Sequence, residues 1–134
     1  MRGQSRFVFA GWLLALGGCG SGSTAHWIDQ LKSSEPKTRL QAVHILQQRK
    51  QDAAQIVPAL IESLKDENSF IRRDAAWTLG SFGEESRNAI PSLQEALHDR
   101  EPSVRKAAAR SLNQIAPAAG EAKRPGNAHA AHSR

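Results

Sequence analysis

Few side chains in this sequence could carry out catalysis. The 134-residue chain has a single cysteine, Cys19, and five histidines, and none of them lies in a Ser/His/Asp or Cys/His arrangement. His44 and His98 are isolated, and no glycine-rich phosphate-binding loop is present. The adjacent carboxylates of Glu84 and Glu85 fall at a turn, where a solvated loop is the simpler interpretation. We therefore expect a protein that is not an enzyme.

Metal ligands are also scarce. His129 and His132 have the i, i+3 spacing of one helical turn, but a metal site needs three or four fixed ligands. Both lie in residues 117–134, which are rich in Ala, Gly and Pro and show no apolar periodicity. We expect a disordered tail over 117–134, no metal and no cofactor.

The elements that position any functional residue follow from a self-similarity at a fixed offset of 33 residues. The matching columns are Leu31, Leu64 and Leu97; Arg39, Arg72 and Arg105; Ala42, Ala75 and Ala108; and Leu46, Leu79 and Leu112. A unit of this length cannot bury its apolar face alone and must stack on copies of itself. The prediction is an all-α, right-handed α-solenoid of three helix pairs, at about 24–50, 51–83 and 84–116.

The second copy, residues 56–83, shows two amphipathic helices joined by a polar turn at 66–69. The apolar positions of the first helix are Val57, Leu60, Ile61 and Leu64, with Pro58 expected in its first turn. Those of the second helix are Ile71, Ala75, Leu79 and Phe82, and Gly83 is expected to end it. Trp27 falls in the column of Leu60 and Leu93, so we expect it to be buried in the first repeat.

Within this unit, the pattern D-x-x-x-x-[IV]-R-x-x-A-A-x-x-L begins at Asp66 and again at Asp99. It resembles the HEAT-like repeats that also occur in phycobilin lyases, and the resemblance covers residues 24–116. The first copy departs from it, since Ser33 replaces the Asp and Thr38 the Ile or Val, which predicts a diverged N-terminal cap. The T-P-L-H opening of the ankyrin repeat, which has a similar length, is missing.

The resemblance also implies a structural ladder of charge-assisted bonds. It suggests that Asp66 pairs with Arg72 or Arg105, and Asp99 with Arg105.

An exposed face of the second helix is the candidate binding site. With the apolar stripe inward, Phe70, Arg73, Asp74, Trp77 and Ser81 point outward, and the 33-residue register places His44 and Arg110 beside Trp77. A Trp flanked by arginines has the composition of a protein-binding hot spot. Alternatively, the indole packs over the arginine stems and has no partner.

The N-terminus has the features of an export signal. Arg2 and Arg6 precede an apolar run at 7–16, too short to span a bilayer, and Leu16-Gly17-Gly18-Cys19 resembles the lipobox of bacterial lipoproteins. We expect residues 1–18 to be removed, Cys19 to be lipidated and 19–23 to form a flexible tether. The alternative is an ordinary signal peptide or a buried helix with an incidental Cys.

The resemblance to a lipobox implies that the protein is located in the bacterial cell envelope. Gly20, directly after Cys19, is similar to the residue at this position in lipoproteins that a diderm cell sends to its outer membrane, where the protein would face the periplasm.

Charge limits the class of partner. The chain has 18 basic and 13 acidic residues, and removal of 1–18 takes away Arg2 and Arg6, which leaves a mature net charge of +3. The charges are mixed along both helices, so we expect no nucleic-acid binding, a class that would require the signal sequence to be spurious.

The sequence thus predicts a membrane-anchored scaffold or adaptor, a monomer that binds an unknown protein partner through the concave face of the solenoid. The alternative is an accessory or assembly factor for an envelope enzyme or a chromophore-loading system.

Overall fold

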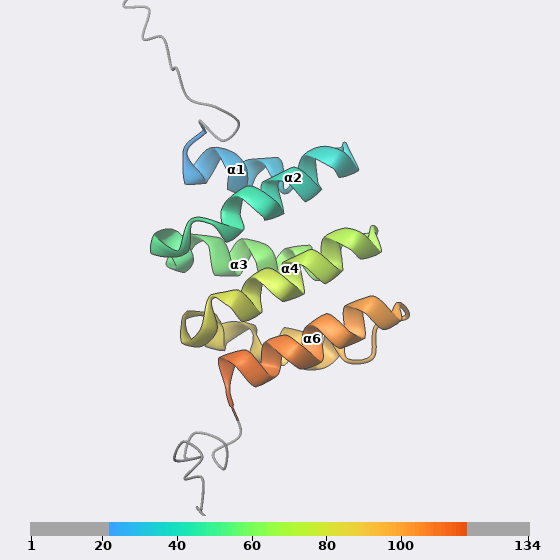
Figure 1. Cartoon of the computed structure of the whole chain (residues 1–134). Helices are drawn as coiled ribbons and strands as arrows, with labels where there is room; N and C mark the ends of the chain where they lie inside the picture. Colours follow the sequence, from blue (N-terminus) through green and yellow to red (C-terminus); the bar gives the residue numbers. More distant parts are fainter. Residues whose placement is uncertain (1–21, 118–134) are drawn as a thin grey trace, which may run out of the picture.

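The computed structural model describes residues 22–117, and every regular element in this range is helical (Figure 1). The elements are α1 (Thr24–Gln30), α2 (Pro36–Gln47), the 3-10 helix η1 (Lys50–Asp52), α3 (Ala53–Ser63), α4 (Ser69–Ser81), the 3-10 helix η2 (Gly83–Ala89), α5 (Ile90–Ala96) and α6 (Pro102–Ile115). Among these described residues, no helix is long and apolar enough to cross a bilayer. The expected signal peptide 1–18, Cys19, and residues 118–134 with His129 and His132 lie outside the described range.

The α-helices form two layers. In Figure 1, α2, α4 and α6 lie side by side in the front layer, and α4 packs against both of its neighbours. Behind them, α1 packs on α2, α3 on α4 and α5 on α6. The described part of the chain is therefore an α-solenoid of three helix pairs, as the 33-residue period predicts.

Small side chains allow the second helices to approach one another. The alanines shared by the three repeats, Ala42, Ala75 and Ala108, are fully buried. At the contact between α4 and α6, Ser111 Oγ donates a buried hydrogen bond of 2.7 Å to the Ala76 carbonyl. A Cβ added to Gly80 would lie only 2.5 Å from Ser111 Oγ. A larger side chain at Gly80 would therefore push these two helices apart.

The ends of the helices agree only partly with the sequence prediction. Gly83, with a φ of 60°, follows α4 and terminates it as expected, because glycine adopts this conformation without a Cβ clash. Pro58, however, lies inside α3 instead of in its first turn, since α3 already begins at Ala53. Pro58 and Ala54 are both exposed, so water can bond the Ala54 carbonyl that proline cannot reach.

Trp27 is less buried than predicted. Leu60 and Leu93 in its column are fully buried, but Trp27 is only partly covered and packs at the edge of the core. The reason is that α1, at the end of the described stack, packs on α2 and α3 and on no preceding repeat. The indole Nε1 is nevertheless closed off from solvent and has no hydrogen-bond partner among residues 22–117.

The last two residues of the expected tether, Gly22 and Ser23, make hydrogen bonds to the first helix pair. Ser23 caps α1 by accepting a hydrogen bond of 3.1 Å from the His26 backbone N–H. Arg49 Nη2 donates a 2.6 Å bond to the Gly22 carbonyl. The first helix pair therefore holds the chain from Gly22 onward.

Candidate protein-binding groove

The helical phase of α4 separates a buried face from an exposed one, as the sequence predicts. Ile71, Ala75 and Leu79 have no exposed surface, whereas Phe70 and Trp77 are 58% and 44% exposed. They are the large hydrophobic side chains most exposed among the described residues. Exposed aromatics on one face of a monomer mark a candidate contact surface.

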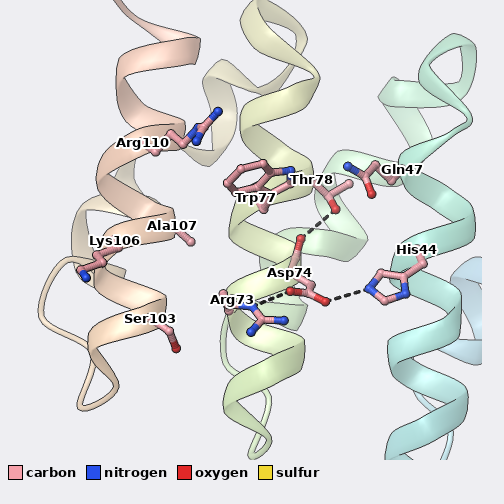
Figure 2. A pocket seen from close by; sticks show the side chains of 10 residues that line it. All are labelled: His44, Gln47, Arg73, Asp74, Trp77, Thr78, Ser103, Lys106, Ala107 and Arg110. Atoms are coloured by element: carbon pink, nitrogen blue, oxygen red, sulfur yellow. Dashed lines mark hydrogen bonds and ion pairs between the residues drawn. The ribbon is translucent and has the colours of Figure 1, made fainter.

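A groove of about 540 Å³ crosses the exposed side of α2, α4 and α6 (Figure 2). Its lining residues are His44, Gln47, Arg73, Asp74, Trp77, Thr78, Ser103, Lys106, Ala107 and Arg110. The residues predicted to bind a partner are Phe70, Arg73, Asp74, Trp77, His44 and Arg110, and all but Phe70 are in this lining. Phe70 lies outside the groove, one helical turn before Arg73, whose guanidinium sits 5.3 Å from the Phe70 ring centre.

Trp77 occupies the middle of the groove, between the other two helices (Figure 2). The guanidinium of Arg110, on α6, lies over the indole at 4.3 Å from the ring centre. Such a contact stabilises the orientation of both groups by about 0.5–1 kcal/mol at an exposed site. The indole therefore packs against an arginine, as the interpretation without a partner expects. It also remains partly exposed to solvent, as a binding hot spot requires.

Asp74, on the same helix as Trp77, fixes the side of the groove that faces α2. Its Oδ2 lies 2.7 Å from His44 Nε2 on α2, and its Oδ1 accepts a 2.7 Å bond from Arg73 Nε. The Asp74 backbone carbonyl accepts a further bond of 2.7 Å from Thr78 Oγ1. One carboxylate thus holds two basic side chains from neighbouring helices in place.

The groove has an excess of positive charge. Arg73, Lys106 and Arg110 line it together with His44, and Asp74 is the single carboxylate in the lining. Asp74 contacts His44 and Arg73. Neither Lys106 nor Arg110 forms an ion pair with a carboxylate among residues 22–117. The arrangement favours a ligand that combines carboxylates with apolar groups.

The predicted site lacked half of the lining. Ser103, Lys106 and Ala107 were missed, although they lie 33 positions after Phe70, Arg73 and Asp74, so the repeat register could have identified them. Gln47 and Thr78 gave no comparable signal. Elsewhere in the described range, no three His, Cys, Asp or Glu side chains converge as metal ligands would.

The helices that carry the groove are locked by an arginine ladder. Arg39 Nε and Nη2 donate to the two Asp66 carboxylate oxygens at 2.8 and 3.0 Å, and Arg72 contacts Asp99 at the same two distances. Hydrogen bonding to Arg72 holds the pKa of Asp99 below its ordinary value, and the same bond raises the pKa of Arg72. Each pair joins successive repeats.

The predicted partners within this ladder were wrong. Asp66 pairs with Arg39, not with Arg72 or Arg105, and Asp99 pairs with Arg72, not with Arg105. The reason is that Nη1 of each arginine bonds the backbone carbonyls of its own repeat's turn, which directs Nε and Nη2 toward the turn of the next repeat. The Arg105 side chain has no carboxylate partner within residues 22–117.

These features define a short α-solenoid with a preformed, basic, Trp-centred groove on its second helices. Family comparison agrees with this class: the chain belongs to the HEAT-repeat family, whose model, described as HEAT repeats, matches residues 24–113.

Among solved structures, the chain is similar to one from the complex of CpcE and CpcF of phycocyanin lyase from Nostoc sp. PCC7120, with 31% identity and a TM-score of 0.66. The match covers 75% of this chain but only 40% of that one. The comparison with curated proteins gave no match.

Proposed function

We propose that the protein is a lipid-anchored interaction module that binds a protein partner through the groove on α2, α4 and α6. The observation that carries this proposal is the half-exposed Trp77 held under Arg110 in the centre of the groove. Tryptophan and arginine dominate binding hot spots, which lie near the centre of an interface. The charge balance of the lining favours a partner segment that presents carboxylates beside an apolar side chain.

The groove is well suited to binding because its walls are held before a partner arrives. Asp74 fixes His44 and Arg73, while Trp77 stacks with Arg110. Side chains that are already ordered lose less conformational entropy on association. Binding energy is therefore expected to concentrate on Trp77.

The test is a photo-crosslinking residue at Gln47, which lines the groove, compared with one at the exposed Glu62 on α3, in the layer behind it. We expect a covalent protein adduct from position 47 in intact envelopes and none from position 62. Trp77→Ala should weaken this capture roughly 30-fold, the equivalent of about 2 kcal/mol.

Phe70→Ala is the matched control, because Phe70 is an exposed aromatic of the same helix outside the groove. It should leave the adduct in place. An adduct that survives Trp77→Ala undiminished would mean that partner binding does not depend on Trp77, and equal adducts from positions 47 and 62 would mean that it does not use the groove.

Anchoring through Cys19 is the second part of the proposal, supported by the lone cysteine in a Leu-Gly-Gly-Cys context. Two acyl signals suffice for stable membrane attachment. Because Gly22, the first residue that the structure describes, is three positions after Cys19, a lipid on Cys19 would hold the N-terminal end of the stack within about 10 Å of the bilayer surface.

Cys19→Ala should release the protein from the membrane fraction or leave an uncleaved precursor, as measured by fractionation and intact mass. Wild-type protein found in the cytosol with its N-terminus intact would contradict the anchor.

A second candidate is an accessory factor for a chromophore-loading or other envelope enzyme. It is favoured by the similarity to a chain of a phycocyanin lyase complex. The same crosslinking experiment separates the two, since this candidate requires the adduct at position 47 to be an enzyme subunit or a chromophore-bearing protein.

A further inference from the structure

Arg105 makes the backbone hydrogen bonds that Arg39 and Arg72 make in the ladder, but not their bonds to an aspartate of the next repeat. Its Nη1 donates to the carbonyls of Asp99 and Arg100 at 2.8 and 3.2 Å. Arg39 Nη1 and Arg72 Nη1 make the same pair of bonds within their own repeats. In those two residues, Nε and Nη2 then bind both oxygens of an aspartate from the next repeat.

The Nε and Nη2 of Arg105 have no such acceptor among residues 22–117, and the side chain is exposed. Because backbone bonds already orient the guanidinium, it is ready to receive a carboxylate in the two-oxygen geometry of the ladder.

The surface around Arg105 is built from residue types that the other repeats bury. Ala109 is exposed and Leu112 half-buried, whereas Ala76 and Leu79, at the same repeat positions, are fully buried. Leu97 is likewise half-buried, while its equivalent Leu64 is buried. A terminal repeat that ends a solenoid in water needs a polar outer face, whereas Ala109, Leu112 and Leu97 leave apolar surface on this one.

The opposite end of the stack does have polar substitutions. Thr38 stands where the later repeats have the buried Ile71 and Val104. Arg49 stands where they have Phe82 and Ile115, and it bonds Thr24 Oγ1 at 3.1 Å. The N-terminal end therefore carries polar side chains at two positions that are apolar in the later repeats, beside the partly covered Trp27. At the α5–α6 end, Ala109, Leu112 and Leu97 stay apolar, so the two ends of the molecule differ.

We infer that the α5–α6 end is a second docking surface, which receives a helix pair of a different HEAT-like chain whose inter-helix turn presents an aspartate to Arg105. A second copy of this protein fits poorly, because it would offer Ser33 in place of the aspartate and Thr38 in place of an apolar residue. Residues 118–134 fit poorly as well, since they contain one acidic residue, Glu121, and no Leu, Ile, Val or Phe.

The chain itself provides a probe for this surface. Ser33 already occupies the ladder turn: its carbonyl accepts the 2.8 Å bond from Arg39 Nη1, and its Oγ accepts the Glu35 N–H at 3.2 Å, as Asp66 Oδ1 accepts the Asn68 N–H. Ser33→Asp with Thr38→Ile therefore gives the N-terminal end the chemistry of an interior repeat. Adding Arg105→Ala prevents this variant from polymerising head to tail.

The experiment titrates this triple variant into fluorescently labelled full-length wild-type protein in detergent and follows anisotropy. We expect binding at least tenfold tighter than wild type shows for itself, and no gain when the labelled protein carries Arg105→Ala. Labelled Lys106→Ala or Trp77→Ala should keep the full gain, because these residues lie in the groove and not at the end face. Failure of groove binding and failure of end docking are thereby distinguished.

Three results would overturn the inference: equal binding by labelled Arg105→Ala, wild-type self-association as tight as binding of the variant, or a gain that appears only after deletion of residues 118–134. The second would identify another copy as the occupant, and the third would identify the tail. Circular dichroism checks that the triple variant is folded. If it is not, Ser33→Asp with Arg105→Ala replaces it, with at least a threefold gain expected.

Discussion

At the residue scale, the repeated arginine of the ladder differs between the interior and the end of the stack. Arg39 and Arg72 are buried and each bridges a turn of its own repeat to the aspartate of the next. Arg105 makes the backbone bonds but has no aspartate within the described range. The repeat pattern reveals that these residues are equivalent, but not which neighbour each contacts, because that depends on the direction of the guanidinium.

This difference predicts unequal responses to lysine. Arg72→Lys should lower the free energy of unfolding by about 1–3 kcal/mol, because an ammonium cannot span two carbonyls and both carboxylate oxygens. Arg105→Lys, at an exposed position, should change it by less than about 0.5 kcal/mol. Urea denaturation of both variants measures the difference, and equal losses would show that the bridged aspartate contributes nothing to stability.

At the scale of elements, α4 was the most predictable helix. Its buried and exposed faces and its end near Gly83 follow from the apolar period and the glycine. The first helices were less predictable, because the 3-10 segments η1 and η2 precede α3 and α5 and have no apolar period of their own. The groove residues on α4 could be inferred from the apolar period of that helix alone. Ser103 and Lys106 on α6 required comparison with the residues 33 positions earlier.

The close approach of α4 and α6 predicts the effect of a single methyl group. Gly80→Ala gains up to about 1 kcal/mol of helix propensity, but its Cβ would meet Ser111 Cβ at 2.8 Å, which the backbone holds in place. We expect a net loss of about 1–3 kcal/mol, measured by thermal denaturation.

Gly83→Ala is the comparison for this variant, because an added Cβ there meets nothing within 4 Å. It should cost about 1 kcal/mol through the positive φ alone. An unchanged or raised melting temperature for Gly80→Ala would mean that the two helices are not packed this closely.

At the scale of the whole molecule, charge divides between the two layers. Each first helix carries one acidic residue and no Lys or Arg; these residues are Asp29, Glu62 and Glu95. Each second helix is net basic. An acidic partner is therefore steered toward the layer that holds the groove and away from the other.

The stack as a whole should unfold as one unit, because three repeats are about the minimum that a solenoid needs. Ala42→Leu overpacks the first repeat, where Ala42 is fully buried, and should cost about 1–3 kcal/mol. If unfolding is cooperative, amide hydrogen exchange in α6 should accelerate by the same factor as in α2, roughly 5- to 150-fold.

Lys37→Ala, an exposed change on the same helix, should leave exchange in both helices unaltered. If α6 keeps its protection while α2 loses it, the first repeat opens on its own. The last two helix pairs would then be stable without it, and a partner at the α5–α6 end could bind them whether or not the first repeat is folded.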